Sequence, residues 1–564
     1  MLKKIEAEIN DYIDKSIDLS DGVTFSQYKE VVRITKYQNH TYKGNKKTDS
    51  QGNYKYWSDI ISPRVDSEVK NIDFDTRDVV ISSKIITDRL AVFISNLYLG
   101  QWMENNKKAE AINEDVEDFS AWGNVVWKKV KDGYEKVDLK NFYVLNQTAK
   151  TLDDSDVIER HLLTQADLRA KDDVWENVDV VIKNCGDRFF KETAKATETT
   201  SSTPYYEIYE RNGDVSTEDL KKLQGKTGGN KDKYVLAKVI VAGLKSGEGG
   251  ERQVLFAEEI SEKPYREAHR SRFEGRWFRK GLYETLMDCQ VRANEISYQI
   301  ARGLEWASKA IFKDSSELIV QNVLTNIRNG DIIKTQELSQ VEVRMQGLDQ
   351  LIADWNRNLE MADRLANSYE VVRGESLPSG TPFRLGSLID QNANKLFNFL
   401  REKLALGLEA VFNDWILPDV MKELRKEKII ELTGNEKHLE EYHKMLAKAW
   451  YIKNLLIIPP HSAEQAEQFL GMKAEEYKKN DKTTIEMEKT LWQGFKPRAR
   501  VRITGEGVDL TGELQTLANF IQLEMDPVRR SALIEMAMSK KGVDITNLPK
   551  TEPELMAPQQ PQTA

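Results

Sequence analysis

The stretch 281–312, GLYETLMDCQVRANEISYQIARGLEWASKAIF, decides how the rest of the chain is organised. Its apolar residues recur every three or four positions, at Leu282, Leu286, Cys289, Ala293, Ile296, Ile300, Leu304 and Ala307. This spacing places them along one side of an α-helix about thirty residues long. The stripe is narrow and charged residues flank it, so it suits side-by-side packing against other helices better than burial inside a globule.

The region after this helix stays largely helical but is interrupted twice. Residues 309–347 form an insert of short apolar runs and turn signals, and a second helix is expected at 348–369. Glycines and prolines mark a loop at 370–386. A third long helix is expected from Ser387 to Ile416, because the residue before Pro418 is restricted away from helical geometry. A plain helical bundle is the alternative organisation.

The region before residue 275 has the patterns of both helices and strands. Dense apolar positions from Thr76 to Leu97 predict a well-buried helix. Strand patterns begin at Val125, and Asp132-Gly133 lies between two of them as a tight hairpin turn. Further strands are expected at 205–209, 234–241, 252–256 and 500–503. The predicted fold class is therefore α+β, mainly α.

Composition limits the classes of function. A chain of 564 residues is longer than one compact hydrophobic core usually takes, so two to four packed regions are expected. With 40% hydrophobic residues, 31% charged residues and no run of about 18 apolar ones, a soluble folded chain is expected, without a membrane helix or a signal peptide. The two cysteines, Cys185 and Cys289, exclude a disulfide framework and favour a reducing compartment. A net charge of −9 argues against tight binding of duplex DNA.

No catalytic or cofactor-binding motif in the sequence has the required spacing. Gly225-Lys226-Thr227 resembles a phosphate loop, but Leu220 stands where that loop needs its first glycine. His438 and His443 are five residues apart, so they diverge on a helix and do not form a zinc-binding pair. The sequence therefore predicts no catalytic residue, no cofactor and no metal site.

Five strings, taken in their order along the chain, resemble portal proteins of tailed bacteriophages, especially those of short-tailed phages. They are GLYETL (281–286), ASKAIF (307–312), RNGDII (328–333), RGESLPSGTP (373–382) and WILP (415–418). The resemblance covers roughly residues 275–418 and, more loosely, the α+β region before them. It rests on the ordered set, since no single string is diagnostic.

The resemblance implies an architecture of wing, stem, clip and crown that assembles as a ring. The implied regions are a wing at 1–275, the first stem helix at 276–308, a clip at 309–347, the second stem helix at 348–369, a tunnel loop at 370–386, a wing helix and return segment at 387–509, a crown at 510–548 and a disordered tail at 549–564.

The resemblance also implies a function. Portal proteins form a homo-oligomeric ring, typically a dodecamer, at one vertex of the capsid, where they start head assembly and pass DNA inward and later outward. The implied partners are double-stranded DNA, held weakly and without sequence specificity, the terminase large subunit, head–tail adaptor and tail proteins, and the major capsid and scaffold proteins, with no membrane. The expected location is the portal vertex of the virion, after assembly in the host cytoplasm. No enzymatic activity is implied.

Two groups of residues are the candidate sites. Helix packing within and between subunits is assigned to seven apolar residues of the stem, namely Leu282, Leu286, Ile296, Ile300, Leu351, Trp355 and Leu359. Arg373 and Arg384 bound the tunnel loop and are candidates for weak, salt-screened DNA contacts. Lys395 and Lys403 are weaker candidates, and Glu375 is a candidate for pairing with a neighbouring subunit. An acidic ring would repel the duplex and centre it.

Two other classes of protein stay open. One is a different virion structural or head–tail adaptor protein with long helices, which a monomer or an open helical assembly would favour. The other is an enzyme with a dispersed site, which stabilisation by a nucleotide or a metal would favour.

Overall fold

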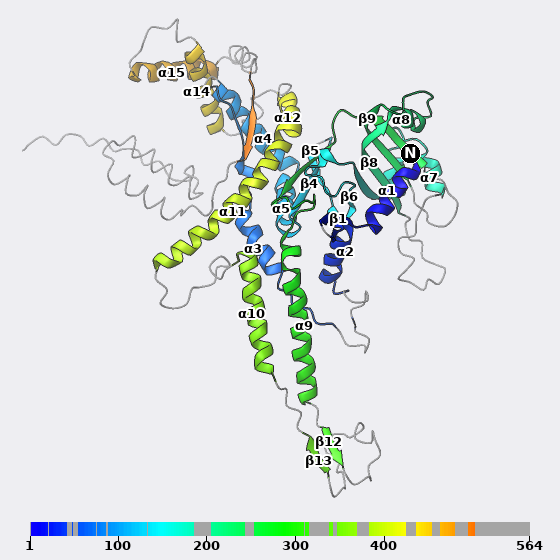
Figure 1. Ribbon diagram of the computed structural model, residues 1–564. Helices are drawn as coiled ribbons and strands as arrows, with labels where there is room; N and C mark the ends of the chain where they lie inside the picture. The colour runs from blue at the N-terminus through cyan, green and yellow to red at the C-terminus, as the bar shows by residue number, and fades with distance from the viewer. Residues whose placement is uncertain are drawn as a thin grey trace, which may run out of the picture. The chain divides into compact units, whose positions relative to one another are not determined.

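The structure is a computed structural model. It describes residues 2–41 (except 21), 48, 55–131 (except 75, 86 and 87), 133–184, 205–242, 253–308, 311–314, 338–341, 347–368, 383–424, 436–453, 463–479 and 495–501. Within these ranges the chain combines α-helices with several small antiparallel sheets (Figure 1), as the sequence predicts. The predicted crown and tail, and residues 370–382 of the predicted tunnel loop, lie outside the described residues.

The largest sheet has five antiparallel strands in the order β10-β9-β8-β7-β6. These strands are β6 (Phe142–Val144), β7 (Val157–Leu163), β8 (Tyr206–Ser216), β9 (Tyr234–Ala242) and β10 (Gln253–Glu259). One face packs against α1 (Leu2–Asp14) and α8 (Thr217–Leu223). The other face packs against α6 (Gln165–Arg169) and α7 (Val178–Asn184). The strands predicted in this region are confirmed.

A smaller sheet has the order β11-β4-β5. Its strands are β4 (Asn124–Val130), β5 (Gly133–Lys136) and β11 (Tyr265–His269). Val130 pairs with Gly133, whose φ of +119° is a conformation that glycine adopts without strain. The hairpin predicted around Asp132-Gly133 is therefore confirmed.

Shorter elements complete the first part of the chain. They are β1 (Ile17–Ser20), β2 (Val23–Phe25), α2 (Gln27–Gln38), α3 (Ser62–Ile72), α5 (Lys108–Ala121) and the 3-10 turns η1 (Thr76–Asp78), η3 (Leu139–Asn141) and η4 (Leu152–Asp154). α2 begins after Ser26, whose hydroxyl accepts a hydrogen bond from the Lys29 N–H and so caps the first turn. α3 begins with Pro63 in its first turn, where no N–H is needed.

The helix predicted from Thr76 to Leu97 is wrong in its first part. Val79–Ser82 form strand β3, which pairs antiparallel with β14 (Arg498–Val501), and helix α4 (Arg89–Asn105) begins only afterwards. The β-branched residues at 79–81 suit a strand once a partner is available. That partner is remote, since the Ser82 hydroxyl donates to a carbonyl 416 residues further along the chain.

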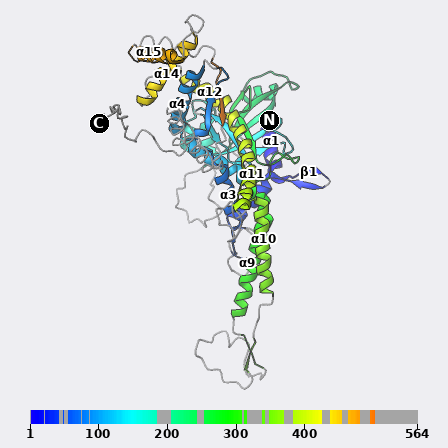
Figure 2. The same cartoon turned by 90° about the vertical axis from the view of Figure 1, so that its left-hand side faces the viewer.

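Two long helices, α9 (Leu282–Ser308) and α10 (Leu348–Ala366), lie side by side and run in opposite directions (Figure 1; Figure 2). Both helices are predicted by their apolar spacing, and both are confirmed. Between them in the sequence, β12 (Ile311–Asp314) and β13 (Leu338–Val341) pair antiparallel, so the insert closes on itself.

The third long helix, α11 (Phe383–Val411), differs from the prediction at both ends. It begins four residues before Ser387, because Gly386 is tolerated inside a helix at a cost of about 1 kcal/mol. It also does not stop before Pro418. A π-helical turn, η6 (Phe412–Ile416), leads directly into α12 (Leu417–Leu424). The wider turn accommodates a proline, which has no N–H and whose ring presses on the carbonyl four residues back.

The largest apolar core joins helices that are far apart in the sequence. It contains side chains of α4, α5, α11, α12, β3 and β14, and of α14 (Glu436–Lys453) and α15 (Ala463–Lys479). A second core holds the start of α9 and the end of α10 against α3 and the sheet of β4. Among the described helices, none is both long and apolar enough to span a membrane.

Candidate functional site

The base of the α9–α10 pair is closed within one chain. Leu282, Leu286 and Ile296 have no exposed surface. The first two belong to a core that also contains Ala362 and Ala366 of α10. These three predicted packing residues therefore stabilise the pair inside the subunit and offer no surface to a neighbour.

The other four predicted packing residues are only partly buried. Ile300, Leu351, Trp355 and Leu359 each keep some exposed surface, and Trp355 and Leu359 lie at the edge of the same core. If the predicted packing residues make contacts between subunits, these four residues are the ones with surface to make them. The stripe is therefore divided between residues that are already buried and residues that retain free apolar surface.

Polar contacts fix the register of the two helices. The Asn358 side chain donates to the Cys289 carbonyl (Nδ2–O 2.9 Å), and Arg292 pairs with Asp354 (Nη2–Oδ2 2.6 Å) on the exposed side. At the base, the buried Arg64 of α3 pairs with Asp363 (Nη2–Oδ1 2.6 Å) and also donates to the Leu359 carbonyl. α10 is thus attached both to α9 and to the body.

A second segment lies along α9. The Gln290 side chain accepts from the Ile60 N–H and donates to the Ser58 carbonyl, and the Asn294 side chain accepts from the Ser58 N–H at 3.0 Å. The Ser58 and Ser297 hydroxyls are 2.6 Å apart. The extended stretch before α3 therefore binds to a polar side of α9 that the apolar spacing did not reveal.

Large apolar side chains are exposed on both helices outside the predicted set. They are Leu304 (50% exposed), Ile352 (45%), Met361 (55%) and Leu365 (39%). Met361 and Leu365 are four residues apart, so they share one side of α10. Leu304 belongs to the predicted stripe of α9, but the other three are not among the predicted packing residues. The i, i+4 spacing of Met361 and Leu365 could have predicted this apolar surface of α10 from the sequence.

The candidates for DNA contact are only partly described. Arg373 and Glu375 lie outside the described residues, and Arg384 is the second residue of α11. Lys395 is exposed on α11. Lys403 is half-buried, and its ammonium donates to the Arg270 carbonyl (Nζ–O 2.8 Å). The structure therefore places Lys403 against the body, and the grouping of the five residues at the channel stays a prediction.

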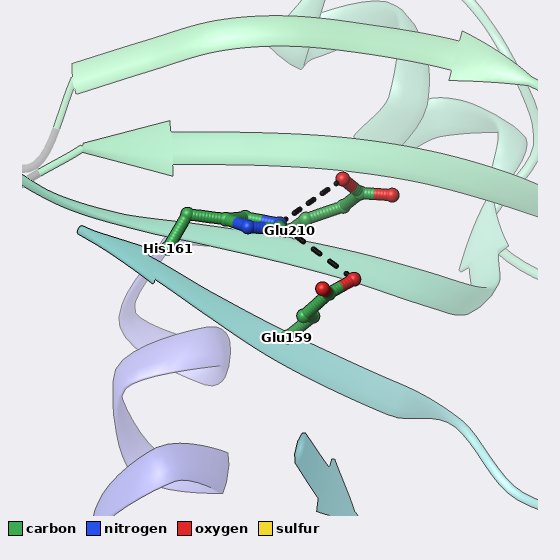
Figure 3. Close-up of side chains that lie close together, drawn as sticks. All are labelled: Glu159, His161 and Glu210. Atoms are coloured by element: carbon green, nitrogen blue, oxygen red, sulfur yellow. Dashed lines mark ion pairs between the residues drawn. The ribbon is translucent and has the colours of Figure 1, made fainter. Parts of the chain in front are cut away.

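One cluster of potential metal ligands is present in the described part of the chain, although the sequence predicts no metal site. Glu159 and His161 of β7 lie next to Glu210 of β8 (Figure 3), with a ligand atom from each within 4.8 Å of the others. Sequence reasoning could not find it, because the three residues share no local motif.

Lysine side chains already neutralise this cluster. The Lys128 ammonium of β4 lies 2.6 Å from Glu159 Oε2 and 2.8 Å from Glu210 Oε2, and Lys238 lies 3.0 Å from Glu210 Oε1. The Tyr265 hydroxyl donates to Glu159 (2.9 Å). A metal ion would have to displace Lys128, so the cluster is suited to joining the two sheets.

The protonation of the cluster agrees with this role. Burial raises the pKa of Glu210, but the hydrogen bond from His161 and the charges of Lys128 and Lys238 outweigh it and hold the pKa well below its usual value. Burial lowers the pKa of Lys128, but the two carboxylates outweigh it and the pKa is raised. Glu210 and Lys128 therefore stay ionised at neutral pH.

Comparison with known protein families gives no match, and no curated protein is significantly similar in sequence.

Proposed function

We propose that this chain is a portal protein of a tailed bacteriophage, which forms a closed ring at one capsid vertex and conducts DNA during packaging and ejection. The ring would be a homododecamer, and it would dock the terminase large subunit first and adaptor or tail proteins later. Major capsid and scaffold proteins would surround it in the virion. The proposal assigns the chain no enzymatic activity.

One observation carries the proposal beyond the ordered strings. α9 and α10 form an antiparallel pair whose interior is closed at its base and whose surface exposes large apolar side chains, namely Ile352 further along α10 and Met361 and Leu365 on the outer side of α10 at the base. Such exposure loses the free energy that burial would provide, roughly 25 cal/mol per Å² of apolar surface. Copies of the same pair packed side by side around a ring would bury it.

The arrangement along the chain agrees with the same proposal. The pair α9–α10 encloses a small antiparallel insert in the sequence, and the long helix α11 follows and packs against β11. α11 approaches the sheet so closely that a Cβ on Gly407 would lie 2.8 Å from the Ala268 Cβ. The predicted wing helix is therefore packed closely against the body.

The experiment is electron microscopy of the purified full-length protein. We expect closed rings with a central hole wide enough for a B-form duplex. The hole must be wider than the two grooves of the duplex, which are about 6 and 12 Å wide. Two preparations are imaged, the protein alone and the protein with its capsid and scaffold proteins. A particle that stays monomeric in both preparations would overturn the proposal, and an open helical assembly would favour a head–tail adaptor or another virion protein.

A further inference from the structure

The segment 270–281, RSRFEGRWFRKG, links β11 to α9 and is strongly basic. It carries five lysine and arginine residues and one acidic residue. Both ends of the segment meet the chain at Gly123, the residue before β4. The Arg270 N–H donates to the Gly123 carbonyl (3.0 Å), and a Cβ on Gly123 would lie 2.5 Å from the Gly281 nitrogen. The segment is therefore a closed loop that concentrates positive charge beside the start of α9.

Carboxylates pair with most of these cations. Arg270 binds both oxygens of the buried Glu68 (2.6 and 2.8 Å), and Arg276 binds both oxygens of Glu284 (2.7 Å each). Arg272 and Lys280 share Glu274, at 3.4 and 3.2 Å. Arg279 then remains without a carboxylate partner among the described residues.

Arg279 is buried and incompletely bonded. The residue is 5% exposed, its Nη2 donates to the Lys150 carbonyl (3.1 Å), and its Nε and Nη1 have no hydrogen-bond partner in the described part of the chain. The ring of Phe273 lies over the guanidinium, 4.3 Å from Cζ, and is itself 44% exposed. The exposed ring of Phe273 therefore covers one face of the Arg279 guanidinium.

Lys403 of α11 adds a second cation without a carboxylate partner among the described residues. Its ammonium donates to the Arg270 carbonyl and lies 4.8 Å from the centre of the Phe399 ring. Burial and the nearby charges of Arg270 and Arg279 lower the pKa of Lys403. Both cations are linked to neighbouring residues: Lys403 bonds to Arg270, whose N–H donates to the Gly123 carbonyl (3.0 Å), and the Arg279 N–H donates to Asn124 Oδ1 (2.8 Å). Two incompletely compensated cations are thus attached to the junction of α11 with the basic loop.

Uncompensated guanidinium donors are unfavourable when buried, because they lose water and gain no acceptor. A planar guanidinium beside an ammonium is a combination that binds the oxygens of a phosphate group. Arg272 precedes Phe273 in the loop and has a side chain that is largely exposed. We infer that Arg279 and Lys403 bind a phosphate group, with Arg272 at the rim and Phe273 as the side chain that moves aside. The inference does not depend on ring formation, since the residues belong to one subunit.

Two sources could supply this phosphate, a free phosphate or nucleotide and the DNA backbone. Titration calorimetry of the full-length protein with inorganic phosphate, and separately with a short DNA duplex, distinguishes them at constant ionic strength. The test variants are Arg279→Gln and Lys403→Gln, and Lys222→Gln on α8 is the control for an exposed lysine. Phe273→Ala removes the cover and leaves both cations in place.

We expect saturable binding of phosphate that weakens at least tenfold in Arg279→Gln and in Lys403→Gln, stays unchanged in Lys222→Gln and strengthens in Phe273→Ala. If DNA binding weakens in the same two variants and phosphate competes with it, the backbone is the source. If DNA binding is unaffected, free phosphate or a nucleotide is the source. Should Arg279→Gln fail to fold, Lys403→Gln decides the result, because Lys403 is half-buried and makes one hydrogen bond. Equal phosphate binding by the wild-type protein and a folded Lys403→Gln variant would overturn the inference, and so would the absence of phosphate binding.

Discussion

The base of the α9–α10 pair and the rest of that pair are built from the same two helices but differ in how they are stabilised. At the base, Leu282 and Leu286 are fully buried, and the buried Arg64 pairs with the partly buried Asp363. Further along, the helices are joined by the exposed pair Arg292–Asp354, and Ile352 stays exposed. The interior of the base is buried within one chain, whereas the exposed apolar side chains of α10 gain burial only from a partner. These side chains are Ile352 further along and Met361 and Leu365 on the outer side of the base.

The first prediction breaks the base. Gly281→Ala would place a Cβ against backbone atoms of residues 121–123, which cannot move aside as a side-chain end can. We expect the free energy of unfolding to fall by roughly 4 kcal/mol or more. Urea denaturation followed by tryptophan fluorescence measures it.

Gly100→Ala in α4 is the matched control, because a Cβ there meets nothing within 4 Å. It should leave stability unchanged or raise it by up to about 1 kcal/mol. Equal unfolding midpoints for the two variants would show that the base is not closely packed.

The second prediction compares the two ion pairs directly. Arg64→Ala removes a buried guanidinium that pairs with the partly buried Asp363 and donates to the Ile60 and Leu359 carbonyls, and we expect a loss of about 3 kcal/mol. Arg292→Ala removes an exposed pair and should cost less than about 1 kcal/mol. Denaturation of both variants at low and high salt measures the difference, and a larger loss for Arg292→Ala would reverse the comparison.

The third prediction concerns a buried acid of the body. Asp115 of α5 is fully buried and accepts from the Tyr134 hydroxyl (3.3 Å), and burial raises its pKa to about 8. The unfolded chain ionises this group near pH 4, so the stability of the folded state should fall as pH rises from about 4 to about 8 and then level off. Asp115→Asn removes this dependence, and its advantage over the wild type should grow by about 1.4 kcal/mol per pH unit in that window.

Thermal unfolding at several pH values tests this third prediction. The control is Glu117→Gln, an exposed residue on the same helix. A difference between Asp115→Asn and the wild type that is constant with pH would contradict the raised pKa.

The smallest effect on the stability of the single chain is expected at the exposed surface of α10. Met361→Ser combined with Leu365→Ser removes exposed apolar groups, so the free energy of unfolding should change by less than about 0.5 kcal/mol. Assembly should weaken all the same, because the lost surface would be buried between subunits. Analytical ultracentrifugation against Met472→Ser, an exposed methionine of α15, tests this prediction. Unchanged assembly would remove this surface from the interface.

Local periodicity was sufficient to predict the long helices and the hairpins. Leu282, Leu286 and Ile296 define a helix because their spacing alone does so, and the Asp132-Gly133 turn needs no remote partner. The strand at Val79–Ser82 could not be predicted in the same way, because its partner β14 is encoded near residue 500. The continuation through Pro418 escaped prediction because a π-helical turn has no known local sequence pattern here.

The candidate sites follow the same rule. The apolar stripe of α9 could be predicted from the spacing of its residues. Its division into buried and exposed residues depends on α3 and on the stretch at Ser58. The Lys128–Glu159–Glu210 cluster and Arg279, which has no carboxylate partner in the described part of the chain, arise where three or more segments meet. The spacing of residues within one segment does not predict contacts between segments that are remote in the sequence.

The most direct test of the account is native mass spectrometry of the purified full-length protein. A closed ring has one fixed number of subunits, so we predict one assembled mass, with no series of intermediate masses when the concentration is raised. A continuous ladder of masses, or a monomer at all concentrations and in the presence of the capsid and scaffold proteins, would contradict the portal proposal.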